Sequence, residues 1–216
     1  MSLRSSIGQV PSLSELTKKI YSKEEIANYR LDESINDNPL AKRPMNIRSK
    51  LAYKEILDNT KPYNKYLLPG QMAIFNYLEP KFKEELEYYD RTPFTLFLGI
   101  TRIQGGQIRE VGLNLHYYPP HARARILNKV YEMFKPHWER NFNTVQHKPN
   151  MVIDYSTLKH TLRHNLKLAF GIKMYIPVLR GNTRVIPARL FSTAFFTEGH
   201  FSKATLQQIF KFWRQF

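Results

Sequence analysis

The chain has 216 residues, with 33 Lys and Arg, 18 Asp and Glu and no cysteine, so its formal net charge is +15. The lack of cysteine excludes a disulfide scaffold and a thiolate zinc site. No apolar run approaches the roughly 20 residues of a membrane span, and the N-terminus lacks the apolar stretch of a signal peptide. A hydrophobic fraction of 42% is enough for a sizeable core. We therefore expect a globular, strongly basic protein whose default partner is a polyanion.

The positive charge is unevenly distributed along the chain. Residues 1–90 hold 14 basic and 13 acidic side chains, a net of +1, whereas residues 91–216 hold 19 and 5, a net of +14. A basic surface that only serves solubility usually intersperses both signs. Phosphate binding needs cations without competing carboxylates, because each neutralised phosphate releases counterions. The C-terminal part is therefore the candidate for binding a polyanion.

Residues 1–64 are expected to form an arm. Within it, residues 14–20 and 22–29 each begin with a serine that can cap a short helix. Residues 32–45 are polar and contain proline, which indicates an extended linker, and residues 48–57 favour one more helix. Few apolar side chains are available here, so we expect the arm to become ordered on another chain.

A compact body is expected over residues 65–216, beginning with strands. Residues 71–78 and 94–103 have strand patterns, and a hairpin loop at Gln104–Gln107 leads into a returning strand at residues 108–118. The returning strand alternates between two faces, with Val111, Leu113, Leu115 and Tyr117 on one and Gly112, Asn114, His116 and Tyr118 on the other.

Three helices are expected in the body. The first begins at Pro120 and runs to about residue 134. The second covers residues 157–170 with Gly171 as its C-cap, and the last covers residues 202–216.

A second hairpin is expected between the last two helices. Residues 172–178 and 184–190 would be its strands, and Arg180–Thr183 its turn. The fold class is therefore α+β, with antiparallel hairpins in a small sheet packed with three helices, plus the extended, partly helical N-terminal arm.

Two features of the body indicate phosphate contact. On the second helix, basic side chains recur every four residues and repel one another unless an anion is present. At the tip of the second hairpin, two guanidinium groups would project beside the turn. Together with the first helix, these features give as phosphate contacts Arg123, Arg125, Lys159, Arg163, Lys167, Lys173, Arg180 and Arg184. The alternatives are an ordinary solvated helix and a basic hairpin tip that docks on an acidic neighbouring protein.

The sequence does not contain the common enzyme motifs. A phosphate-binding loop, a dinucleotide-binding glycine motif and a nucleophile elbow are all missing. Asp90, Glu110 and Asp154 are isolated, whereas a metal-dependent nuclease needs clustered carboxylates. His160 and His164 are one helical turn apart, but no acidic ligand follows at metal-site spacing. We therefore expect no catalytic residue, no metal and no cofactor.

Several segments resemble the DNA end protector family of T4-like tailed phages. The most specific is Val111–Pro120, which matches a G-x-N-x-H-Y-x-x-P signature, and residues 69–77 and 87–94 match weaker motifs. The resemblance spans about residues 65–216 and includes the closing helix. Arg189 stands where that family usually has Glu, and residues 1–64 have no counterpart that can be aligned.

The resemblance implies a non-enzymatic virion structural protein that sits on the packaged genome end near the portal or neck and protects DNA ends from host exonucleases. Its partners would be double-stranded DNA, bound without sequence preference, and portal, neck or tail proteins, contacted through residues 1–64. We expect several copies in a symmetric assembly, in the virion and during assembly in the host cytoplasm, with no membrane contact. The alternative is a head–tail connector, tail or baseplate component whose basic face binds an acidic protein.

The family signature is expected to be structural. Its residues here are Gly112, Asn114, His116, Tyr117 and Pro120. Asn114 and His116 are expected in a buried hydrogen-bond network that holds the helix after Pro120.

Overall fold

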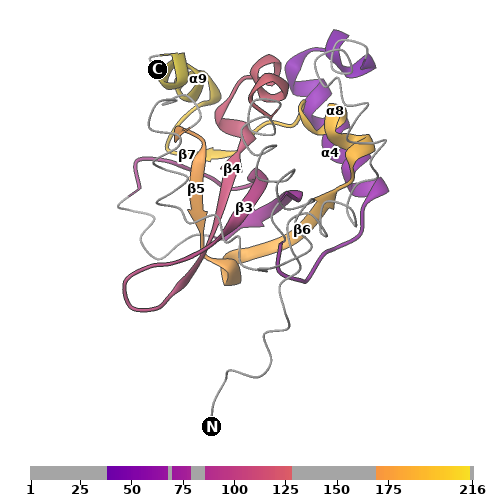
Figure 1. Cartoon of the computed structure of the whole chain (residues 1–216). Helices are drawn as coiled ribbons and strands as arrows, with labels where there is room; N and C mark the ends of the chain where they lie inside the picture. The colour runs from indigo at the N-terminus through magenta and orange to yellow at the C-terminus, as the bar shows by residue number, and fades with distance from the viewer. Residues whose placement is uncertain (1–37, 68–69, 79–85, 128–168, 215–216) are drawn as a thin grey trace, which may run out of the picture.

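The computed structural model describes residues 38–67, 70–78, 86–127 and 169–214, and their arrangement is α+β as expected (Figure 1). A five-stranded antiparallel sheet has the order β5-β4-β3-β1-β6, and a two-stranded sheet pairs β2 with β7. The strands are β1 (Met72–Tyr77), β2 (Tyr89–Asp90), β3 (Phe94–Arg102), β4 (Ile108–Asn114), β5 (Ile172–Tyr175), β6 (Arg180–Ile186) and β7 (Phe201–Ser202). The helices are α4 (Met45–Asn59), α8 (Phe191–Ala194), α9 (Leu206–Arg214) and a helix that begins at Pro120, of which residues 120–127 are described.

The hairpin of β3 and β4 forms as predicted, with Gly105 and Gly106 in its loop at φ 85° and 74°. The strand prediction for residues 115–118 is wrong. The Asn114 side chain accepts a hydrogen bond from the backbone N of His116 at 3.0 Å and starts a 3-10 turn over Leu115–Tyr117. This local side-chain bond competes with strand pairing and ends β4 at Asn114.

The second hairpin is also wrong, because β5 and β6 lie at opposite edges of the sheet. β5 pairs with β4, whereas β6 pairs with β1. Residues 180–183 are not a turn but the start of β6. There Ile74 pairs with Arg184 and Asn76 pairs with Gly181. Between these two pairs β6 has one residue more than β1. One residue of this stretch, Asn182, has a φ of 49°. The Gly-Asn pair therefore marks a β-bulge.

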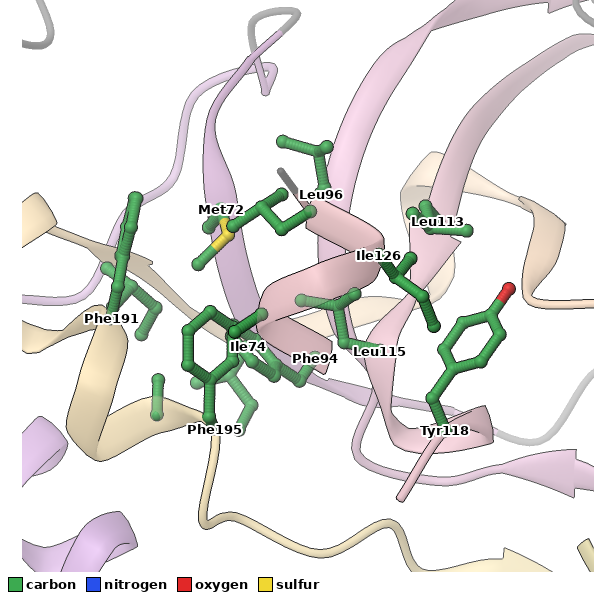
Figure 2. Packing of buried hydrophobic residues seen from close by; sticks show 14 of the residues in the cluster. Met72, Ile74, Phe94, Leu96, Leu113, Leu115, Tyr118, Ile126, Phe191 and Phe195 are labelled. Carbon is green, nitrogen blue, oxygen red and sulfur yellow. The ribbon is translucent and has the colours of Figure 1, made fainter. Parts of the chain in front are cut away.

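The large sheet is covered on both faces. On one face, Met72 and Ile74 of β1 belong to a core closed by α4, α8 and the helix from Pro120 (Figure 2). On the other, Phe75 packs edge-to-face on Tyr175, with ring centroids 5.3 Å apart. Burying each such side chain contributes about 1.5–3 kcal/mol. A buried residue at almost every position of β1 explains why that strand lacks a polar face.

Helix α4 lies on the body, although it falls within the predicted arm. Its Ala52 and Ile56 side chains are fully buried. The hydroxyl of Tyr53 donates to the backbone O of Glu198 at 2.9 Å, and Pro62 forms a β-bridge with Arg184. The structure thus places this part of the expected arm against the domain, while residues 14–29 lie outside the described residues.

Among the helices predicted for the body, the last one differs from the structure at its start. Helix α9 begins after Thr205 instead of at residue 202, because Thr205 and Gln208 form a reciprocal capping box. Gly171 follows directly after the helical residue Ala169 and the turn residue Phe170, and a Cβ at Gly171 would also overlap the ring of Tyr118. Residues 128–134 and 157–168 of the other two helices lie outside the described residues.

Candidate nucleic-acid interface

Asp90, at the end of β2, is the centre of a buried polar network and is 3% exposed. Its Oδ2 accepts a hydrogen bond from Asn114 Nδ2 at 3.1 Å and lies 2.8 Å from His116 Nδ1. Its Oδ1 accepts from the backbone N of Thr92 at 3.0 Å and of His200 at 3.1 Å. Burial alone would raise the pKa of Asp90, but these interactions outweigh it and lower that pKa below its ordinary value.

His116 extends the network to the segment after α8. Its Nε2 lies 2.9 Å from Thr197 Oγ1, which donates to the backbone O of Ala194 at 2.7 Å. Burial lowers the pKa of His116 more than the neighbouring Asp90 raises it. The Asp–His–Thr order resembles a nucleophilic triad, but the His116 side chain is fully buried. The network therefore joins three chain segments and offers no reacting group to a substrate.

Arg123 fastens the helix from Pro120 to the same segment. Its Nε donates to the backbone O of Tyr118 at 2.9 Å, and its Nη1 donates to the backbone O of Phe195 at 2.6 Å and to that of Thr197. The side chain is fully buried, and burial lowers its pKa to about 10. A phosphate has no access to this guanidinium, which corrects the expectation that Arg123 contacts DNA.

The remaining signature residues are also placed by packing. A Cβ on Gly112 would overlap Thr95 Cγ2 on the neighbouring strand, so only glycine fits there. The Tyr117 ring packs edge-to-face on Phe201, with centroids 5.0 Å apart.

Arg180 forms a buried ion pair instead of projecting from a hairpin tip. Its Nε lies 2.7 Å from Glu110 Oε2, and the two side chains are 8% and 2% exposed. Its guanidinium also lies 5.8 Å from the Phe75 ring centroid. Burial raises the pKa of Glu110 and Arg180 opposes this rise. The Arg180 charge is therefore balanced within the fold, so it is not a free phosphate ligand.

Arg184 and Lys173 are half-buried, and each contacts a partner within the fold. Arg184 Nη1 donates to the backbone O of Thr60 at 2.6 Å. Lys173 Nζ lies 4.3 Å from the Tyr117 ring centroid and 5.5 Å from that of Phe170, and burial lowers its pKa to about 8.

Of the predicted phosphate contacts among the described residues, Arg125 is the one that is exposed. It lies two residues after the buried Arg123 on the same helix and is exposed to solvent. Lys159, Arg163 and Lys167, and the histidines at 160 and 164, lie outside the described residues.

A basic hairpin that sequence reasoning missed is the end of β3–β4, which projects from the sheet (Figure 1). Arg102 is exposed, and Arg109 is half-buried with its Nη2 donating to Gln107 Oε1 at 2.6 Å. Ile100 and Ile108 are 38% and 43% exposed beside them. The signal was present in the sequence, because an arginine stands on each side of the loop that was recognised as a hairpin.

A cavity of about 380 Å³ lies at the edge of the sheet beside β6. Its lining comes from the segment after α4, from the 3-10 turn Pro177–Leu179 and from β6. The lining residues are Tyr63, Asn64, Lys65, Tyr66, Pro177, Val178, Arg180, Asn182 and Thr183. None carries a carboxylate, so the cavity is suited to a neutral or anionic ligand.

The described part of the chain contains neither a metal-binding cluster nor a membrane-spanning helix. There, no group of three or more His, Asp or Glu side chains is arranged to hold a metal ion. Likewise, none of the described helices is long and apolar enough to cross a membrane.

Comparison with known protein families gives a match over most of the chain. Residues 10–190 match the family described as phage T4 terminal DNA protecting protein. The match includes most of the segment 1–64, for which the signature motifs gave no counterpart, and it ends before α8 and α9. No curated protein and no solved structure matches the chain. Since the family match covers most of its length, and the signature residues Asn114 and His116 bond to Asp90 in its buried network, the chain belongs to the phage T4 terminal DNA protecting protein family.

Proposed function

We propose that this protein binds the ends of packaged double-stranded phage DNA without sequence preference and shields them from host exonucleases. The observation that carries the proposal is the net charge of +14 over residues 91–216, in a chain whose family is named for protecting terminal DNA. Cations in such excess over carboxylates bind phosphates by releasing counterions and do not read base sequence.

The phosphate contacts are assigned to cations that the fold leaves accessible. Among the described residues these include Arg125 and, on the β3–β4 hairpin, Arg102 and Arg109. A basic hairpin can follow a groove of the duplex while its arginines contact the backbone. The row Lys159, Arg163 and Lys167 remains part of the proposal.

The protein acts without catalysis and within the virion, near the portal or neck, in several copies. Residues 1–64 provide the contact with neighbouring virion proteins. Protection then comes from occupying the DNA end and denying it to the nuclease.

A second candidate is a head–tail connector, tail or baseplate component that binds an acidic protein. The exposed Ile100 and Ile108 beside Arg102 favour it, because apolar side chains rimmed by charge are typical of protein interfaces.

Duplex binding across a salt series separates the two candidates. The purified protein is titrated onto a duplex and onto its scrambled sequence between 50 and 200 mM salt. DNA-end protection requires equal affinity for both sequences and a fall of at least about a hundredfold across the series. It also requires that bound, end-labelled DNA resists a processive exonuclease. Undetectable duplex binding at the lowest salt, or full degradation of saturated DNA, would reject this function in favour of a protein partner.

Location is tested in intact particles. A cross-linker placed by substitution at Ser22 is expected to capture portal or neck protein, and capture of baseplate protein alone would contradict the placement.

A further inference from the structure

The backbone that lines one side of the cavity beside β6 is held in place by hydrogen bonds. The backbone N of Tyr63 donates to the backbone O of Thr183 at 2.8 Å, and Arg184 Nη1 holds the backbone O of Thr60. The Tyr63 hydroxyl donates to the backbone O of Tyr66 at 3.2 Å, and Leu67 is buried at 4% exposure. The segment that supplies half of the lining is therefore anchored at both ends, and a preorganised cavity loses little entropy when it binds.

The lining combines three kinds of chemistry. Tyr66 and Val178 are 73% and 84% exposed, and with Pro177 they present an aromatic and apolar surface to solvent. Asn64 and Asn182 bring amide groups that can both donate and accept hydrogen bonds. Lys65 brings a positive charge at an exposed position.

The charge balance limits what the cavity can take. Arg180 is already neutralised by Glu110, so Lys65 is the lining cation that has no counter-charge among the described residues. One flat apolar group, a polar edge and one anionic group fit this lining. A cavity of about 380 Å³ is at the small end of ligand sites, large enough for one nucleotide and too small for a stacked base pair.

We propose that this cavity binds a single unpaired nucleotide at the end of the phage DNA. Its base stacks on the Tyr66 ring against Pro177 and Val178, its edge meets the amides of Asn64 and Asn182, and its phosphate contacts Lys65. A base inside a duplex has both faces stacked and its pairing edge occupied, so it cannot enter. The cavity therefore distinguishes a DNA end from duplex interior, a selection that rests on the proposed function and that counterion release alone cannot provide.

The test compares three DNAs of one duplex sequence at one salt concentration. They are a dumbbell whose two ends are closed by non-nucleotide linkers, so that it has no unpaired base, a blunt duplex, and a duplex with a three-nucleotide single-stranded overhang. Because stacking a base on an aromatic side chain gains about tenfold or more in affinity, the overhang DNA is expected to bind about tenfold more tightly than the dumbbell. Tyr66→Ala is expected to remove that difference and leave dumbbell binding unchanged, whereas Tyr66→Phe keeps the ring and the difference.

Two controls address the rest of the surface. Leu57→Ala removes an exposed apolar side chain of α4 that does not line the cavity, and it is expected to change nothing. Lys65→Gln is expected to weaken overhang binding more than dumbbell binding, whereas Lys50→Gln, an exposed lysine of α4, affects both equally.

The outcomes separate this inference from the function on which it rests. Wild-type protein that binds none of the three DNAs would reject the proposed function itself. Protein that binds the dumbbell and the overhang DNA equally, or a Tyr66→Ala variant that retains the preference, would overturn the nucleotide site while DNA binding stands. Loss of particle assembly by Tyr66→Ala without any change in DNA preference would likewise overturn it and assign the cavity to a protein partner.

Discussion

Charged residues have opposite roles in two regions of the molecule. One region is the buried network around Asp90, and the other is the surface, which includes the β3–β4 hairpin and the β6 cavity. In the network, Arg123 and His116 are fully buried and bound to fixed partners. On the surface, Arg102 and Lys65 are exposed to solvent. The two arginines at 123 and 125 show that basic residues two positions apart in the sequence can serve entirely different ends. A net charge therefore overstates the cations that are available to DNA.

The largest effect is expected from Arg123→Met. The substitution leaves the backbone oxygens of Tyr118, Phe195 and Thr197 without their donor, and we expect the free energy of unfolding to fall by about 3 kcal/mol or more. Arg125→Met, on the same helix, is expected to stay within about 0.5 kcal/mol of wild type. Urea unfolding measures both. Similar stabilities for the two variants would contradict the conclusion that Arg123 stabilises the fold whereas Arg125 does not.

The second effect is expected from Gly112→Ala, which places a methyl group against Thr95 Cγ2 and costs about 1–3 kcal/mol. Thr95→Ser removes the obstructing methyl, so the double variant should recover part of the loss. Gly181→Ala in β6 is the matched control, since the nearest atom to its new Cβ is Asn76 O at 3.8 Å. If thermal unfolding showed equal losses for both alanine variants, the close packing at Gly112 would not be the reason for its glycine.

The third effect concerns pH and again separates buried from exposed residues. His116 binds a proton near pH 6.5 in the unfolded chain. In the folded chain burial lowers the pKa of His116, so it binds the proton only at lower pH. The free energy of unfolding should therefore fall as pH drops below about 6.5. His116→Gln is expected to flatten this dependence, and Leu57→Ala, which removes an exposed side chain of α4, is not. Denaturant midpoints between pH 7.5 and 5 provide the measurement, and a rise in stability toward pH 5 would reverse the assigned sign.

The smallest effect is expected on the surface, from Arg102→Gln with Arg109→Gln. Stability should change little, but the slope of log affinity against log salt should decrease by about 2, since each phosphate contact contributes about 0.9. Lys50→Gln with Lys54→Gln removes the same charge from α4 and is expected to change the slope less. Equal slopes for the two double variants would mean that the hairpin is not part of the DNA site.

The features that the sequence predicted correctly depend on interactions between residues that are close together in the chain. The alternation of apolar residues and the glycines of the loop predicted the β3–β4 hairpin. The family signature was recognisable because its residues lie within one short segment of the chain. The Gly-Asn pair at 181 was misread as a turn because a bulge and a turn both favour these residues. Only the pairing of β6 with β1, which is remote in sequence, distinguishes the two. The ion pair of Arg180 with Glu110 could not be predicted for the same reason, because the two residues are far apart in the sequence.

The cavity could not be predicted at all. Its walls come from the segment after α4 and from the start of β6, which meet through the bond between Tyr63 and Thr183. Residues 1–64 were interpreted as an arm because they contain few apolar side chains. Two of them, Ala52 and Ile56, are nevertheless fully buried where α4 packs on the core.

The order of the strands has a consequence for how the chain is made. β1, near residue 72, finds its partner β6 only when residue 186 has been synthesised, because Met72 pairs with Ile186. Until then one side of β1 is an unpaired edge, which is a template for association between unfinished chains. Such distant pairings also form slowly, because a long loop must close before any contact compensates for the lost entropy. Shortened chains that end before β6 should therefore aggregate, and the cavity is among the last parts of the molecule to exist.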